Sequence, residues 1–176
     1  MPYDISGDAI LSEALAYWRS KRAGRAMPQR RDIDPCDIPR LLPHVQITEL
    51  VDGGARVRYR LSGTAVTAMY GAELAGRYFD EVFSGERLKF IEDNYRTMCR
   101  EKHPILVRNR YLSLKEVEFV ATRLVMPLSE DGACVNQALT AITFHFLGEV
   151  KQSDGAWLGI GEKFDFGNSF CEILRG

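Results

Sequence analysis

The chain has 176 residues, of which 45% are hydrophobic and 27% charged, and this composition excludes a largely disordered protein. The 23 basic and 24 acidic residues leave a net charge of -1, so no overall positive field is available to hold nucleic acid or an anionic membrane. The sequence shows neither a signal-peptide pattern nor an apolar run of the ~18 residues that span a bilayer, and we expect a cytoplasmic protein.

An amphipathic helix is predicted near the N-terminus, with Ser6 as its cap and Gly24 beyond its end. Leu11, Leu15 and Trp18 form its apolar stripe. Either the rest of the domain or a second copy of the helix must cover this stripe. We predict a homodimer in which these three residues are the contacts.

The run KRAGRAMPQRRD follows the helix and is dense in arginine and lysine. It lacks the interleaved aromatic residues of a nucleic-acid surface, and the chain has no net positive charge. A solvated connector is therefore favoured over a patch for nucleic acid or acidic lipid. Asp34 and Pro35 then predict a short helical turn, with Asp34 as its cap.

Five strands and a group of helices are predicted in the central part of the chain. Segment 45–50 and the strand through Val57 predict a hairpin around a Gly-Gly turn. Short helices follow, and a long helix over 84–102 is ended by Pro104. The three remaining strands form an antiparallel meander over 105–113, 117–128 and 135–147.

This order of elements predicts the fold class. Because all these helices fall between the second and third strands, they must cover one face of a single antiparallel sheet. We predict an α+β domain over 44–148, preceded by the helix and connector over 1–43 and followed by a glycine-rich tail over 149–176. A space is left between the sheet and the helices.

Three segments resemble those of a known family: AYWRSKRAGRAMPQRRDIDPCDIPRLLPHV, YRLSGTAVTAMYGAELAGRYFDEVF and RLVMPLSEDG. They are similar, in the same order, to the leader, the YRLAGT…FGRELTGR stretch and the strand ending in Pro-Leu of a PAS subfamily found mostly as small bacterial proteins. The resemblance covers 16–147. It implies a five-stranded sheet, a small-molecule cavity and dimerisation through the N-terminal helix, and it transfers no catalytic residue.

A cluster of aromatic and methionine side chains would line any cavity between the sheet and the helices, and plain core is the alternative use of the same residues. Tyr70 and Tyr95 offer hydroxyl groups that can orient a ligand. His145 lies between Phe144 and Phe146, and it reaches the cavity only if those phenylalanines face away from the helices. The predicted ligand contacts are Met69, Tyr70, Tyr78, Phe79, Phe83, Tyr95, Met98 and His145.

The ligand does not follow from the resemblance, because members of the wider PAS group bind different cofactors or none. Haem is not expected, since His103 ends the long helix and is predicted to face solvent. Flavin is not expected either, because the NCRFLQ-like motif of the photosensors is missing and Cys99 lies on the long helix. The sequence contains no HExxH, P-loop, GxSxG or CxxC motif, so no metal site or catalytic residue is predicted.

We therefore predict a non-catalytic sensory or regulatory module that binds a small ligand, a partner protein or both. Two alternatives stay open. A small cone-shaped isomerase or dehydratase would need a carboxylate or His145 as a general base inside the cavity. A purely structural interaction domain would have no cavity.

Overall fold

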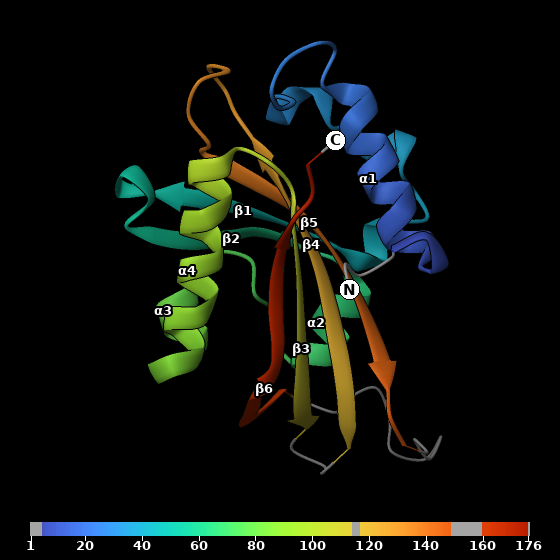
Figure 1. Ribbon diagram of the computed structural model, residues 1–176, viewed down its shortest axis with the longest axis vertical. Coiled ribbons are helices and arrows are strands. Elements are labelled where there is room, and N and C mark those ends of the chain that lie inside the picture. The colour runs from blue at the N-terminus through green and yellow to red at the C-terminus, as the bar shows by residue number, and fades with distance from the viewer. Residues whose placement is uncertain (1–4, 114–116, 149–159, 176) are drawn as a thin grey trace.

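The computed structural model describes residues 5–113, 117–148 and 160–175, which form an α+β fold around one antiparallel sheet (Figure 1). The sheet has six strands in the order β2-β1-β5-β4-β3-β6. Helix α1 covers one face, and α2, α3 and α4 lie against the other. The elements are α1 (Ala9–Lys21), β1 (Val45–Val51), β2 (Arg56–Ser62), α2 (Thr64–Tyr70), α3 (Phe79–Val82), α4 (Gly85–Glu101), β3 (Ile105–Ser113), β4 (Glu118–Leu128), β5 (Gln137–Phe146) and β6 (Ile160–Ile173).

The hairpin, the long helix and the meander predicted from the sequence are confirmed. Strands β1 and β2 pair antiparallel around a turn in which Gly53 and Gly54 both have positive φ, a backbone conformation that glycine adopts without strain. Strands β3, β4 and β5 pair in sequence order. Helix α4 ends at the left-handed Lys102, two residues before Pro104. Within the described residues, no helix combines the length and hydrophobicity that a membrane span requires.

The cap of α1 differs from the prediction. The carboxylate of Asp8, rather than Ser6, accepts hydrogen bonds from the backbone N–H groups of Ile10 and Leu11, at 3.1 and 3.0 Å. Its second oxygen accepts a bond of 2.7 Å from the hydroxyl of Thr143 on β5. Asp8 therefore starts the helix and also ties it to the sheet, a double role that local sequence does not reveal.

The glycine-rich tail contributes a sixth strand, so the expectation of five strands is corrected. Strand β6 pairs antiparallel with β3 and continues the sheet beyond it (Figure 1). Immediately after β6, the N–H of Leu174 donates to the carbonyl of Pro104, at 2.8 Å. Arg175 forms an ion pair with Glu101 at the end of α4, with the nitrogen and oxygen 3.0 Å apart. The end of the tail is thus joined to the element that precedes β3.

The apolar stripe of α1 is covered by the sheet of the same chain. Leu11, Leu15 and Trp18 are 0%, 7% and 2% exposed, in a core that they share with alternate residues of β3, β4 and β5. Of the two coverings that the sequence allowed, the domain itself is the one observed. These three residues, predicted as dimer contacts, are core residues of the single chain, and the homodimer itself stays a prediction.

Candidate functional site

A small pocket, here called the inner chamber, lies between the sheet and helices α2 to α4, where the sequence placed a cavity. Its volume of about 40 Å³ is enough for about three water molecules, since one water needs roughly 10–15 Å³. Four of the eight predicted ligand contacts line it: Tyr70, Phe79, Phe83 and Tyr95. The apolar residues that complete its wall are Tyr59, Phe90, Ile91, Val107 and Val125.

The aromatic part of the wall is built around Phe79 on α3. Its ring centroid lies 4.7 Å from that of Tyr59 on β2, 5.2 Å from that of Tyr95 on α4 and 6.1 Å from that of Phe83. Edge-to-face contacts of this kind fix ring orientations as well as burying area. Burial raises the pKa of Tyr95 to about 12 and that of Tyr59 well above its usual value, so both hydroxyls stay neutral at physiological pH.

The floor of the inner chamber is polar and comes from the sheet. Arg123 stands in the middle of β4, with Asn109 on β3 and Thr140 on β5 to either side. Strand register places the three on a diagonal: Arg123 is opposite Val107, and Thr140 is opposite Val125. Side chains in such positions point to the same face of a sheet, and diagonal neighbours lie within reach of one another.

The polar groups of this floor are only partly paired. Arg123 donates through Nη1 to Oδ1 of Asn109 at 3.3 Å and through Nη2 to the hydroxyl of Tyr70 at 3.4 Å, both at the long end of the hydrogen-bond range. Its guanidinium also lies 5.3 Å from the ring centroid of Tyr111. Nδ2 of Asn109 is buried and has no hydrogen-bond partner within the described protein, whereas the buried Oγ1 of Thr140 has the hydroxyl of Tyr95 as its neighbour.

A second and larger space, here called the outer hollow, has a volume of about 360 Å³ and lies on the other side of Tyr95. It is formed by the β1–β2 turn, the second half of α4 and the β4–β5 loop, residues 129–136. The hydroxyl of Tyr95 is 3.0 Å from Oγ1 of Thr48, and this bond holds the ring as a partition between the two spaces.

The other four predicted contacts lie elsewhere. Met69 packs against an aromatic cluster at another part of the sheet, and Met98 is fully buried in the core beneath α4. Tyr78 is near the surface, where the guanidinium of Arg56 stacks 3.7 Å above its ring centroid. His145 is exposed on the face of the sheet that carries α1, because its neighbours on β5, Phe144 and Phe146, face the side of α2. None of the four lines the inner chamber.

The polar floor was missed by the sequence analysis, although a signal was present. Arg123 is the one charged residue in the stretch VATRLVMPL, which otherwise reads as buried strand. Alternation along a strand decides which face each residue takes, but not which face holds the chamber. Asn109 is likewise a polar residue within an apolar strand sequence, LVRNRYL. The arginines on either side of it make this pattern harder to recognise.

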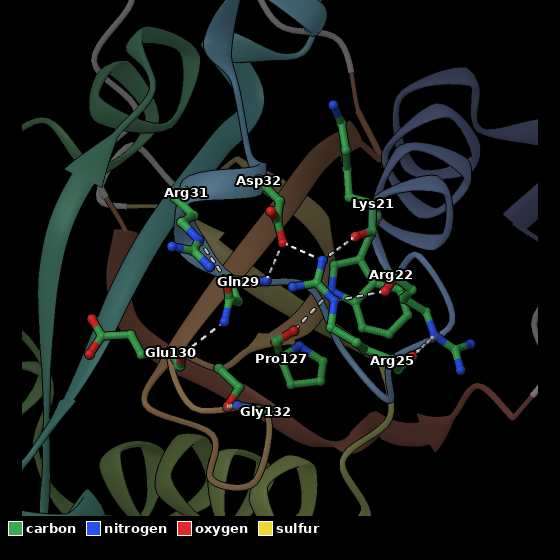
Figure 2. A network of polar contacts seen from close by, with 11 residues as sticks. Lys21, Arg22, Arg25, Gln29, Arg31, Asp32, Pro127, Glu130 and Gly132 are labelled. Atoms are coloured by element: carbon green, nitrogen blue, oxygen red, sulfur yellow. Dashed lines mark hydrogen bonds and ion pairs between the residues drawn. The ribbon is translucent and has the colours of Figure 1, made fainter.

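The arginine-rich run was predicted as a solvated connector. It folds into a compact segment, here called the arginine-rich segment, that is held by its own hydrogen bonds (Figure 2). Nε and Nη2 of Arg25 donate to the carbonyls of Arg22 and Lys21, both at 3.0 Å, and Nη2 also meets the carboxylate of Asp32 at 2.5 Å. The same carboxylate accepts the backbone N–H of Gln29 at 2.8 Å, which is the main reason that the pKa of Asp32 is lowered. Local ion pairs and carbonyl contacts thus shape this segment.

Residues 8–44, here called the leader, are bonded to the loop that lines the outer hollow. The indole N–H of Trp18 donates to the carbonyl of Pro127 at 2.9 Å in a buried contact. Nε2 of Gln29 donates to the carbonyl of Glu130 at 2.9 Å (Figure 2). The β4–β5 loop is therefore held by the leader on one side while it forms the outer hollow on the other.

Comparison with known proteins gives one finding. A model of the PAS domain family matches residues 8–143, from the cap of α1 into β5. No curated protein and no solved structure matches the chain. The matched span includes the leader, the helices around the inner chamber and all three polar floor residues.

Proposed function

The chain belongs to the PAS domain family, and on that premise we propose that it is a sensory or regulatory module that binds a small ligand in the inner chamber. The lining consists of aromatic, amide, hydroxyl and guanidinium groups, which bind and orient a molecule. This lining favours binding over the alternative of an isomerase or dehydratase. It also favours a ligand-binding module over a purely structural domain.

The buried hydrogen-bonding groups of the floor carry this proposal, foremost the unpaired Nδ2 of Asn109. Nδ2 of Asn109 and Oγ1 of Thr140 belong to side chains that are each only 2% exposed. Burying a donor without a partner costs roughly 1–3 kcal/mol, and most buried polar groups in proteins are therefore paired. A ligand that accepts hydrogen bonds from both groups would recover that free energy.

We propose that a structural change caused by ligand binding passes from the inner chamber through the sheet to the leader. Arg123 and Thr140 face the inner chamber, whereas their strand neighbours Leu124, Leu139 and Ala141 pack under α1. A displacement of β4 or β5 caused by a ligand would therefore reach α1 directly, because packed interiors transmit strain. We propose that a partner protein or a second copy of the chain reads this change at the outer surface of the leader.

The test uses Thr140→Val, with Thr122→Val as a matched control. Thr122 is also buried, at 5% exposed, but it lies on β4 with its side chain on the opposite face of the sheet. Native mass spectrometry after incubation with a cell extract should show a small bound molecule on the wild type and on Thr122→Val, and not on Thr140→Val. Thr140→Val should stay folded, because valine nearly preserves the side-chain volume and the hydroxyl of Tyr95 keeps its bond to Thr48.

Equal retention of a ligand by Thr140→Val would place the binding site outside the inner chamber. No retention by any of the three proteins, together with no stabilisation by a metabolite library, would contradict ligand sensing and leave the structural domain as the better account.

A further inference from the structure

We propose that the ligand of the inner chamber is a small carboxylate of two or three carbons, paired with Arg123. This inference rests on the proposed ligand-sensing function and names the chemical class of the ligand. It starts from the charge of Arg123, which is permanent because a guanidinium is not deprotonated in proteins.

The contacts of Arg123 in the described part of the chain are with neutral groups. They are the amide of Asn109, the hydroxyl of Tyr70 and the ring of Tyr111. Burial raises the pKa of Tyr111, so this phenol does not supply a negative charge at physiological pH. Arg123 forms no ion pair with a carboxylate among the residues described. A half-buried positive charge without a counter-charge is unfavourable, and an anionic ligand would supply the missing charge.

The donors around Arg123 match the shape of a carboxylate. The terminal nitrogens bond to Asn109 and Tyr70 at long distances of 3.3 and 3.4 Å, so their N–H groups can turn to the two oxygens of a planar anion. Nδ2 of Asn109 and Oγ1 of Thr140 add one donor on each side of the guanidinium. An anion with two oxygens can accept from all of these groups, whereas a neutral apolar ligand leaves them unpaired.

The size and the opposite wall of the chamber restrict the rest of the ligand. A volume of about 40 Å³, equal to about three waters, accommodates roughly three to five non-hydrogen atoms. Phe90 and Ile91 give the α4 side of the chamber an apolar part, which suits a methyl or ethyl group, and Asn94 lines it from the same helix. Acetate and propionate meet both conditions, but phosphate esters and aromatic acids are too large. Chloride and inorganic phosphate lack the apolar part.

A route to the chamber is also present. A surface groove of about 200 Å³ is lined by two arginines, Arg77 and Arg87, against one carboxylate, Glu81, and it shares Tyr70 and Phe83 with the inner chamber. These two rings meet edge to face, with centroids 6.2 Å apart, and form the partition between groove and chamber. Basic side chains at an entrance raise the local concentration of anions. A small acid can thus reach Arg123 when the two rings part.

The experiment titrates sodium acetate and sodium propionate into the full chain at constant ionic strength, with sodium chloride and sodium phosphate as control salts. Calorimetry and amide chemical shifts measure binding. The wild type should bind both carboxylates, and Arg123→Met should bind them at least ~30-fold more weakly, which corresponds to loss of a buried charged partner. Arg110→Met is the matched control, because Arg110 is paired with Glu118 at the surface, and it should bind as the wild type does.

A second variant keeps the test decisive if Arg123→Met does not fold. Asn109→Asp places a carboxylate where Oδ1 of Asn109 already accepts from Arg123. It should raise the melting temperature of the free protein and abolish acetate and propionate binding, because the counter-charge is then built in. Unchanged carboxylate binding by Asn109→Asp would overturn the assignment to Arg123.

The outcomes separate this inference from the function on which it rests. If the wild type binds neither carboxylate but retains another molecule that Thr140→Val loses, the carboxylate class is wrong and ligand sensing stands. If chloride and phosphate bind as tightly as acetate, the site is a general anion site and the inference is overturned. If no ligand of any kind is retained, the proposed function fails as well.

Discussion

Replacement of Gly63 by alanine tests how tightly the leader is built into the domain. Gly63 follows β2 and is the N-cap of α2, with φ −67° and ψ 157°, a conformation open to any residue. A Cβ atom there would lie 2.3 Å from the carbonyl oxygen of Leu42 and 2.4 Å from that of Pro43. Both oxygens belong to the backbone of the leader, so they cannot rotate away as a side chain would.

The expected cost follows from three contributions. The leader must move by about 1 Å to restore ordinary contact, and overpacking of this kind costs roughly 1–3 kcal/mol. That movement weakens the 2.7 Å bond from the N–H of Gly63 to the carbonyl of Val45, for about 1 kcal/mol more. The reduced entropy of the unfolded chain returns about 0.4–1 kcal/mol. We expect a net loss of about 2–3 kcal/mol.

Urea unfolding monitored by circular dichroism measures this loss, with Gly7→Ala as the matched control. A Cβ at Gly7 meets no atom within 4 Å, and its substitution should change the free energy of unfolding by less than about 0.5 kcal/mol. With a urea dependence of about 1–3 kcal/mol per molar, Gly63→Ala should unfold roughly 1–2 M earlier at an unchanged slope. Equal stability of the two variants would refute the close contact between leader and α2.

Three further predictions concern the leader and the loop it holds. Trp18→Phe leaves the buried carbonyl of Pro127 without its donor and should lower the free energy of unfolding by about 1–3 kcal/mol, measured by urea unfolding. Leu15→Asp places a charge in the core and should unfold the protein, so that the cooperative thermal transition is lost. A folded monomer is the result expected if Leu15 were a dimer contact. Asp131, whose pKa is lowered to about 2 mainly by the backbone N–H of Cys134, should stabilise the fold above the unfolded pKa of about 3.9. Asp131→Asn should therefore be less stable than the wild type at pH 7, with a difference that shrinks as the pH falls from about 4 to 2; a difference independent of pH would contradict this.

The strands and helices of the central region could be predicted because each has its own periodicity. The hairpin β1–β2 is marked by alternation and a Gly-Gly turn, and α4 by apolar residues three and four apart. Strand β6 has the same kind of alternation, with Phe164 and Phe166 between polar neighbours, but the surrounding glycines suggested a loop. Pairing with β3 decides its structure, and that pairing depends on residues far away in sequence.

Features that depend on distant contacts could not be predicted. The choice of Asp8 over Ser6 as helix cap is coupled to Thr143 on β5. The burial of the stripe of α1 by its own sheet could not be told from burial by a second copy, because both remove the same apolar surface from water. Aromatic residues such as Phe79 could be predicted as chamber lining from their residue type. Arg123 could not, because its position in the chamber depends on the register of β4 with β3.

The attachment of α1 also affects how the protein reaches its fold during synthesis. Trp18 bonds to a carbonyl 109 residues later, and Asp8 to a hydroxyl 135 residues later. Helix α1 is made before every strand, yet the surface that buries its stripe is complete only after β5. At roughly 5–20 residues per second, the ribosome leaves the stripe exposed for on the order of ten seconds. The nascent chain therefore presents an apolar helix to chaperones, and one of the first elements to be synthesised is among the last to dock.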